Sequence, residues 1–113
     1  MKNYEKNIAE DLMLEVGLGA TYSNGRDSYP YYVSELLPRG VIGLYKPASH
    51  FPEGKDWTYG SMDVDPFDSG HPTETYIRRC YGHWWTCNKD GKKISRWHSI
   101  AFGHACSYQD PSF

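Results

Sequence analysis

The last third of the sequence brings cysteine and histidine residues close together, as in a metal-binding site. Within 27 residues it holds Cys80, His83, Cys87, His98, His104 and Cys106. Structural zinc sites take four thiolate or imidazole ligands in tetrahedral geometry, and the candidate ligands are Cys80, His83, Cys87, His104 and Cys106. The spacing is against this interpretation, because no Cys-x-x-Cys pair is present. Alternatively, the cysteines are small buried hydrophobic residues, and no other cofactor is indicated.

The same residue types could serve nucleophilic catalysis, in which a nearby base activates a thiol. Cys80 or Cys106 would be the nucleophile, with a histidine as the base. No nucleophile elbow or phosphate-binding loop accompanies them, since Gly17-Leu18-Gly19 precedes an expected strand rather than opening a helix. The sequence therefore favours a protein without catalytic activity, and a small hydrolase is the less favoured alternative.

Aromatic and basic side chains are interleaved over residues 78–98. The segment contains Arg78, Arg79, Trp84, Trp85, Lys92, Lys93, Arg96, Trp97 and His98. Proteins that bind single-stranded nucleic acid stack bases on aromatic rings and hold phosphates with Lys and Arg. Exposed Trp and Tyr beside Arg also mark interfaces with proteins. We therefore expect a ligand or partner surface made by Arg78, Arg79, Trp84, Arg96, Trp97 and His98.

Strand alternation gives a plainer interpretation of the same segment. If residues 83–87 form a strand, Trp85 and Cys87 face one side and Trp84 and Thr86 the other. One tryptophan would then lie in the core, and the other would be exposed or under a loop. Residues 74–98 carry six Lys and Arg against two acidic residues, so the compensating acid lies in residues 1–73.

A second window, residues 26–32, combines an Arg-Asp pair with three tyrosines. In one interpretation it is a turn whose Arg26 and Asp27 satisfy local backbone groups, followed by a strand with aromatic packing. In the other it is a ligand loop, in which Arg26 holds a phosphate or carboxylate and a tyrosine stacks on the ligand. Arg26, Tyr29 and Tyr31 are the expected binding residues in that case.

Short strands and tight turns must position these residues. Strands are expected at 20–23, 31–36, 41–45, 57–62, 75–80, 83–87 and 97–102. Turns are expected at Asn24-Gly25 and at Asn88–Gly91. Apolar residues that recur at helical spacing predict a helix from Asn3 to about Glu15. The predicted fold is mainly β: a small antiparallel sheet or partly closed barrel of five to seven strands, with one short N-terminal helix.

Length and composition indicate a single domain over residues 1–113. We expect an N-terminal helix in 1–17, a first β-hairpin or meander in 19–45, a long Pro/Gly loop region in 46–73, and a second meander with a tail in 74–113. The aliphatic residues are few, but 10 Tyr, 4 Trp and 4 Phe can supply a core. The formal net charge of −2 is against a disordered chain and against a general polyanion binder.

Neither the first residues nor the cysteine content indicates export. Residues 1–9 mix charged and polar residues with no apolar segment of a signal peptide. Three cysteines cannot all pair within one chain, which favours reduced thiols in a cytoplasm. No apolar run approaches the roughly 20 residues that a membrane span needs, so no membrane partner is expected.

Four stretches carry a resemblance to a known family. They are GATYSNGRDSYPYYVSEL (19–36), VIGLY (41–45), TYIRRCYGHWWTCNKDGKKI (75–94) and FGHACSYQDPSF (102–113). Together they resemble a family of small, uncharacterised proteins of tailed phages and prophages, which end in Tyr-x-Asp-Pro-Ser-Phe. The resemblance covers about two thirds of the chain, and residues 46–73 depart from it. It implies a phage or prophage origin and a cytoplasmic location in an infected or lysogenic bacterium, but no activity.

These features predict a non-enzymatic binding protein, a phage or prophage accessory factor. It would bind a host protein or sequester a small anionic, nucleotide-like ligand, and counter-defence is one such role. The first alternative is a β domain that binds single-stranded nucleic acid. The second is a zinc-stabilised domain or a small hydrolase. The sequence sets no oligomeric state, and a homo-oligomer is compatible with it.

Overall fold

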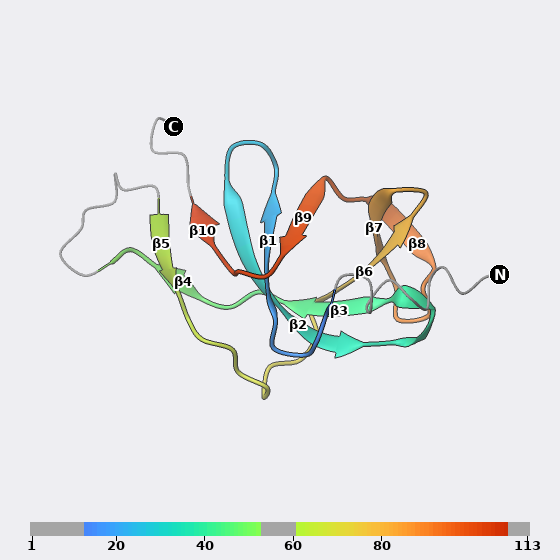
Figure 1. Cartoon of the computed structure of the whole chain (residues 1–113), viewed down its shortest axis with the longest axis horizontal. Coiled ribbons are helices and arrows are strands. Elements are labelled where there is room, and N and C mark those ends of the chain that lie inside the picture. Colours follow the sequence, from blue (N-terminus) through green and yellow to red (C-terminus); the bar gives the residue numbers. More distant parts are fainter. Residues whose placement is uncertain (1–12, 53–60, 109–113) are drawn as a thin grey trace.

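A computed structural model describes residues 13–52 and 61–108, which form an antiparallel β-structure (Figure 1). In these residues the strands are β1 (Gly19–Ser23), β2 (Ser28–Leu36), β3 (Ile42–Tyr45), β4 (Ser49–His50), β5 (Ser61–Val64), β6 (Thr75–Cys80), β7 (His83–Cys87), β8 (Lys93–Arg96), β9 (Ser99–Phe102) and β10 (Ser107–Tyr108). A 3-10 turn, η1 (Pro38–Gly40), joins β2 to β3. Every strand pairing is antiparallel. The predicted mainly β, antiparallel class is therefore confirmed.

The number of strands differs from the prediction. The described residues form ten strands rather than five to seven. Two of the additional strands, β4 and β10, have two residues each, which is too short to leave an alternating pattern. A third additional strand, β8, was not expected. The strand expected at 97–102 is present as β9, and Trp97-His98 connects β8 to β9. The strand expected at 57–62 overlaps β5 only at its end, and residues 53–60 lie outside the described part.

The predicted N-terminal helix does not reach Glu15. Met13 has a φ of 55°, which is incompatible with a right-handed helix. Further on, the Gly17 N–H donates to the Val33 carbonyl (2.8 Å), and the Val33 N–H donates to the Leu18 carbonyl (2.9 Å). The chain is thus already paired with β2 before β1 begins. Residues 1–12, which hold most of the predicted helix, lie outside the described residues.

Both turns expected from Asn and Gly are confirmed. The Asn24 side-chain carbonyl accepts two backbone N–H groups of the β1–β2 turn, at 3.0 and 2.9 Å. The Asn88 side chain does the same in the β7–β8 turn, at 3.0 and 2.9 Å. Gly25 and Gly91 adopt φ values of 98° and 91°, which glycine accepts without steric cost. These turns set the register of the strands that they join.

The long strand β2 is the centre of the sheet. One of its edges pairs with β1, which also pairs with β9. Its other edge pairs with β10 at Ser28 and with β3 from Tyr32 onward. Two branches begin there, β10–β5–β4 and β3–β6–β7–β8 (Figure 1). The sheet is not closed into a barrel, because β8 and β9 are separate strands that pair with β7 and β1 respectively.

The buried cluster lies on one side of this sheet. It consists of Leu14, Val33, Ile42, Leu44 and Ile77. Val33 pairs with Leu44, and Ile42 pairs with Ile77, so these side chains share one face. We call this side of the sheet the core face. Aromatic and aliphatic side chains from the other elements pack against it: Leu18, Tyr31, Trp84, Trp97, Ile100 and Phe102.

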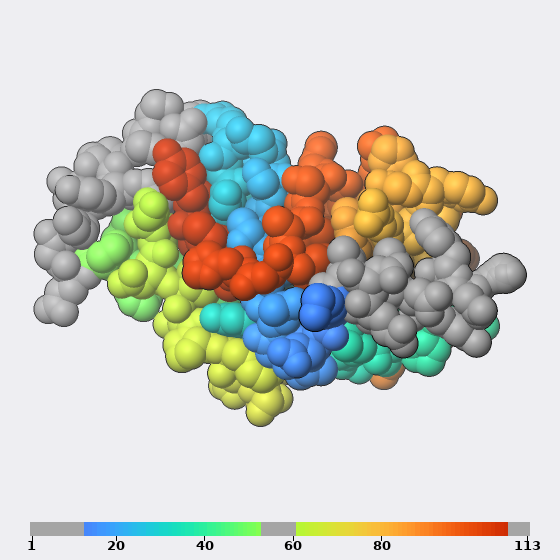
Figure 2. All heavy atoms as spheres, in the orientation of Figure 1, coloured from blue at the N-terminus to red at the C-terminus, as the bar shows by residue number. Residues whose placement is uncertain are grey.

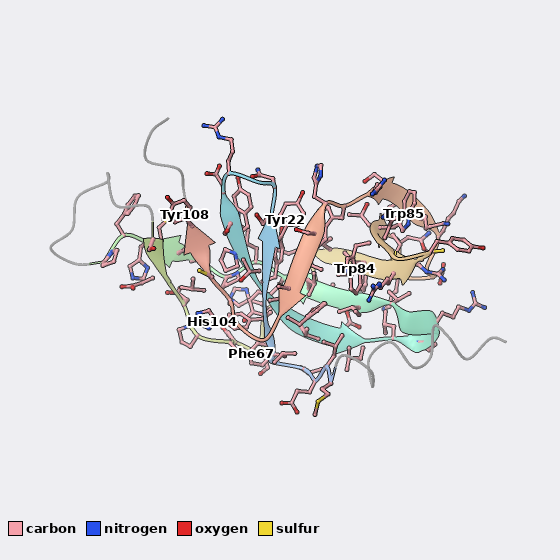
Figure 3. The ribbon with its side chains drawn as sticks, turned by 45° about the horizontal axis from the view of Figure 1, so that its top comes forward. Tyr22, Phe67, Trp84, Trp85, His104 and Tyr108 are labelled. Carbon is pink, nitrogen blue, oxygen red and sulfur yellow. The ribbon has the colours of Figure 1, made fainter. Side chains whose placement is uncertain are left out.

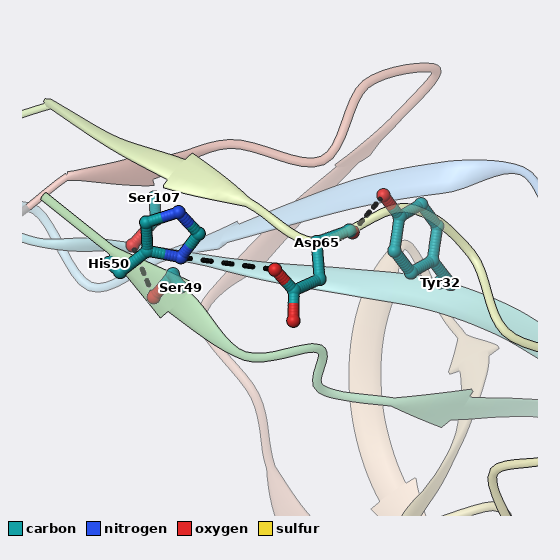
Figure 4. A network of polar contacts seen from close by, with 5 residues as sticks. All are labelled: Tyr32, Ser49, His50, Asp65 and Ser107. Atoms are coloured by element: carbon teal, nitrogen blue, oxygen red, sulfur yellow. Dashed lines mark hydrogen bonds and ion pairs between the residues drawn. The ribbon is translucent and has the colours of Figure 1, made fainter. Parts of the chain in front are cut away.

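One polar contact joins the β10–β5–β4 branch to the central strand β2, and two more connect residues within that branch (Figure 4). The Tyr32 hydroxyl donates to the Asp65 carbonyl (2.7 Å). His50 Nδ1 lies 3.8 Å from Asp65 Oδ1, and Ser107 Oγ donates to Ser49 Oγ (3.3 Å). The strands β4, β5 and β10 are short and form few ladder hydrogen bonds. These side-chain contacts supplement them.

A carboxylate network lies beside a β-bulge in β2. The Thr73 hydroxyl donates to Glu35 Oε2 at 2.5 Å, and the Tyr76 hydroxyl donates to the same oxygen at 3.0 Å. These two hydrogen bonds lower the pKa of Glu35, burial opposes the shift, and the charge of Lys89 adds a smaller lowering effect. The network holds the segment before β6 against β2.

The network predicts a specific dependence of stability on pH. The pKa of Glu35 is lower in the folded protein than its ordinary 4.5. The ionised network therefore stabilises the fold above that value, and this contribution is lost as the pH falls through the folded-state pKa. The free energy of unfolding, measured with urea between about pH 7 and about pH 3, should fall less steeply with acid in Glu35→Gln than in the wild type. Glu15→Gln, at an exposed carboxylate, is the matched control. Equal slopes for Glu35→Gln and the wild type would contradict the prediction.

Candidate ligand-binding surface

Strand alternation places the tyrosines of β1 and β2 on the core face. Tyr22 and Tyr29 are partners across the two strands, and Tyr31 pairs with Ala20. On its other side Tyr22 pairs with Ile100 of β9. Because cross-strand partners point to the same side, these tyrosines extend the core face from the buried cluster toward the β1–β2 turn.

Three aromatic rings form a row on this extension. Trp97 stacks on Tyr22, with ring centroids 4.3 Å apart and planes inclined by 24°. Tyr22 stacks in turn on Tyr29, at 6.2 Å and 30°. We call Trp97, Tyr22 and Tyr29 the aromatic row. Lys46 Nζ lies 4.6 Å from the centroid of the Tyr29 ring, so the row ends at a cation.

The row is anchored to the core by Tyr31 and flanked by His98. Tyr31 meets Trp97 edge-on, with centroids 5.5 Å apart, and packs against the buried cluster. Burial raises the pKa of Tyr31, and the charge of Glu74 adds to this effect. Its phenol therefore stays protonated and uncharged near neutral pH. The exposed His98 ring lies 6.4 Å from Tyr22.

A pocket of about 280 Å³ opens at the lysine end of the row. It is lined by Asp27, Ser28, Tyr29, Lys46, Ser49, Met62, Ser107 and Tyr108, and we call it the Tyr29 pocket. Small-molecule sites measure roughly 300–1,000 Å³, so it suits a ligand of nucleotide size or smaller. In Figure 2 the blue β1–β2 hairpin is flanked by β10 and β9, both red to orange. In Figure 3, Tyr22 and Tyr108 project from these neighbouring strands.

Part of the predicted site is assembled here. Tyr31 from the first window meets Trp97 from the second directly. Tyr29 and His98 both contact Tyr22, which links the two windows. Arg26 lies in the exposed β1–β2 turn, where its backbone N–H donates to a side chain of the turn. The local turn predicted for this window and the expected aromatic packing are therefore both present.

The other predicted residues lie on β6, β7 and β8. Trp84 and its partner Arg79 are on the core face, where Trp84 packs against the buried cluster. Arg78 and Arg96 are both partners of Trp85, on the opposite face. The predicted alternation of the two tryptophans is confirmed. Trp85, rather than Trp84, shares a face with these two arginines.

The cysteines and histidines do not converge. Cys80 and His83 lie at the β6–β7 turn, Cys87 lies at the far end of β7, and His104 and Cys106 lie in the β9–β10 connection. Among the described residues no group of three or more His, Cys, Asp or Glu could hold a metal ion. Burial raises the pKa of the Cys87 thiol, although Arg78 opposes the shift. Cys87 thus has the character of a small hydrophobic residue.

Among the cavities elsewhere in the described residues, two are larger than the Tyr29 pocket. One, of about 410 Å³, is lined by Gly19, Tyr32, Met62, Asp63, Val64, Gly103, His104, Ala105 and Cys106. Within the described residues no hydrogen bond joins the His104 and Cys106 side chains, so the geometry shows no activated thiol. The other, of about 300 Å³, lies beside His71, which stacks on Tyr45 at 5.0 Å and approaches Asp68 at 3.5 Å.

The predicted set omits several residues of the aromatic row and the Tyr29 pocket, among them Tyr22, Lys46 and Tyr108. Lys46 follows Leu44 by two residues, so continued alternation from β3 would have placed it on the core face. Tyr22 required the pairing of β1 with both β2 and β9. Tyr108 lies in a two-residue strand, for which the sequence carries no local signal.

No protein-family model, curated protein or solved structure matches the chain. In residues 13–52 and 61–108 no helix is long and apolar enough to cross a membrane. The described residues form an antiparallel β protein with an aromatic row and an adjoining pocket.

Proposed function

We propose that the protein is a non-enzymatic binding protein whose ligand is a small anion with a planar ring, such as a nucleotide. The observation that supports this most strongly is the position of Lys46, 4.6 Å over the Tyr29 ring in the wall of a pocket. A cation and aromatic side chains that line one pocket match a ligand that carries both a negative charge and a ring.

The lining of the Tyr29 pocket suggests how such a ligand lies. The Lys46 ammonium pairs with the anionic group, and the planar ring lies against Tyr108, because Lys46 already lies over the ring of Tyr29. The hydroxyls of Ser49 and Ser107 can hydrogen-bond to sugar hydroxyls or phosphate oxygens. Asp27 Oδ2 accepts a hydrogen bond from the Tyr29 hydroxyl (3.4 Å), which fixes a carboxylate beside the ring. That carboxylate favours ligands with N–H donors.

The resemblance to phage and prophage proteins supports a role inside an infected or lysogenic bacterium. The protein would sequester its ligand there or occupy a host protein, and counter-defence is one form of this role. A cytoplasmic location and an accessory function are parts of the same proposal. The three cysteines, an odd number, favour reduced thiols and so support this location.

The row itself favours a second candidate, single-stranded nucleic acid. Trp97, Tyr22 and Tyr29 offer more than one ring along a line, as a strand of stacked bases would require. The net charge of −2 opposes this candidate, because affinity for a polyanion depends on cations. We therefore place it behind a mononucleotide.

The first test is the substitution Lys46→Met, which keeps the aliphatic stem and removes the charge. We expect AMP, GMP, CMP or UMP to raise the Tm of the wild-type protein and to give a measurable Kd by calorimetry. Loss of a charge-assisted contact, worth about 1.5 kcal/mol, should weaken that binding about tenfold in Lys46→Met.

Lys89→Met is the matched control, because Lys89 is an exposed lysine in the β7–β8 turn. It should bind like the wild type. Inorganic phosphate and uridine each lack half of the ligand and should bind more weakly than UMP. Equal loss in the two Met variants, or no binding of any mononucleotide at millimolar concentration, would overturn the proposal. Tighter binding of oligothymidylate, falling steeply with salt, would favour the second candidate.

A further inference from the structure

The face of β6, β7 and β8 opposite to the core carries a line of cationic residues around one tryptophan. Arg78, Trp85 and Arg96 are partners across the three strands, so they lie side by side. His83 precedes Trp85 by two residues on the same face. Lys93 Nζ lies 5.1 Å from the centroid of the Trp85 ring. We call Arg78, His83, Trp85, Lys93 and Arg96 the Trp85 face. Figure 3 shows Trp85 at the end of the molecule away from Tyr108.

Two cations of this face, Arg96 and Lys93, contact an imidazole and a thiol. Arg96 Nη2 lies 2.9 Å from His83 Nδ1, and Lys93 Nζ donates to Cys80 Sγ at 3.7 Å. On the same face, Arg78 Nη1 donates to the Gly91 carbonyl (2.8 Å). Imidazole and thiol partners position Arg96 and Lys93 without neutralising them. Among the described residues neither of these two cations has a carboxylate partner, and both side chains are exposed.

The surrounding sequence leaves this charge uncompensated. From Thr75 to Arg96 the chain has six Lys and Arg and one acidic residue, Asp90. The net charge of the whole chain is nevertheless −2, so its acid lies elsewhere. A local cationic patch on a protein of negative net charge attracts a short acidic group more readily than a long polyanion.

The ring of Trp85 is not free to stack on a nucleic-acid base. Lys93 already covers the Trp85 ring, and the indole Nε1 is enclosed. Single-stranded nucleic acid gains much of its affinity from stacking on free rings, and Trp85 does not offer one. Two exposed side chains adjoin it instead: Tyr81, 89% exposed in the β6–β7 turn, and Ile94, 70% exposed. Apolar and aromatic residues of this kind bury well against another protein.

Backbone pairing at this edge is unfavourable. β8 is the last strand of its branch, but it has a bulge, in which Ile94 lacks a partner on β7. A bulge beside a lysine is a common device against pairing with a further strand. Contact at this face therefore runs through side chains.

We propose that the Trp85 face docks an acidic segment of another protein. Carboxylates of the segment pair with Arg96 and Lys93, and its apolar side chains contact Ile94 and Tyr81. This surface is separate from the Tyr29 pocket, and the inference does not depend on the proposed ligand.

The test uses a fluorescein-labelled oligoglutamate peptide and an oligothymidylate of equal charge, each followed by anisotropy at low salt. We expect the peptide to bind the full-length wild type, with affinity that falls as salt rises. The double variant Lys93→Gln/Arg96→Gln should bind about tenfold more weakly, because it loses two exposed charge pairs. Both side chains are exposed, so the variant should keep the wild-type Tm. It should also keep nucleotide binding.

Arg26→Gln/Lys46→Gln removes the same number of charges at the other surface and is the matched control. It should leave peptide binding unchanged. Equal weakening in the two double variants would show a general charge effect and overturn the proposal. So would a failure of the peptide to bind at low salt. Tighter binding of oligothymidylate than of the peptide would reassign the face to nucleic acid.

Discussion

Replacing Ile77 by alanine is expected to destabilise the fold by about 2–5 kcal/mol. Ile77 is completely buried in β6, within the cluster that also contains Val33, Ile42 and Leu44. Its removal loses the transfer free energy of the deleted carbons and leaves a cavity that strands on both sides prevent from collapsing. Small domains have a total stability of about 5–15 kcal/mol, so this one change could remove a large part of it.

Ile94→Ala is the matched control for this prediction. The chemical change is the same, but Ile94 is 70% exposed in β8, and its truncation should alter stability by less than about 0.5 kcal/mol. Urea unfolding, followed by circular dichroism, measures both variants. If Ile77→Ala unfolds outright, the milder Ile77→Val should still cost about 0.5–1.5 kcal/mol. Equal effects of Ile77→Ala and Ile94→Ala would show that the buried cluster does not carry the stability.

Local signals in the sequence were sufficient for the middle of the fold. β6 and β7 occupy the predicted residues, and β3 lies within its predicted range. Alternation also placed Trp84 and Trp85 on opposite faces. These elements are long enough to show an alternating side-chain pattern, and the Asp90-Gly91 turn marks where β7 ends.

Local sequence signals could not predict which distant strands pair with each other. The meeting of Tyr22 with Trp97 depends on the pairing of β1 with β9, whose residues are separated by most of the chain. The same limit applies to Tyr108, which reaches the Tyr29 pocket through the β10–β2 and β10–β5 pairings. Alternation also separates the faces of Trp84 and Trp85 without indicating which face is covered, and it is Trp84 that packs against the buried cluster.

Some of the abundant aromatic residues are buried in the protein, and others line the candidate binding surface. Tyr45 is 1% exposed and lies beside Tyr32 and Phe67 under the segment before β6. Tyr29, by contrast, lines a pocket, and its ring makes a cation–π contact with Lys46. Tyrosine can do both because it combines a large apolar ring with a polar end. The count of aromatic residues thus predicts neither a core nor a site by itself.

Gly19→Ala is expected to affect both stability and binding, because the β9–β10 connection crosses β1 directly over this residue. A Cβ at position 19 would lie 2.6 Å from the Ala105 backbone nitrogen and 3.0 Å from the His104 carbonyl carbon. The connection cannot easily move away. Thr21 Oγ1 donates to the His104 carbonyl (2.6 Å), and the Gly19 carbonyl accepts from the Gly103 N–H (2.8 Å).

The substitution must therefore shift backbone on one side or the other, and overpacking of this kind costs about 1–3 kcal/mol or more. Gly70→Ala is the control, since its Cβ would meet only the end of the Asp68 side chain, at 3.2 Å. It should cost less than about 1 kcal/mol. Because β1 carries Tyr22, the strain at Gly19 should also disturb the aromatic row and weaken nucleotide binding, as measured by calorimetry on the folded variant. A Gly19→Ala protein with wild-type Tm and wild-type affinity would show that the connection does not hold β1 in place.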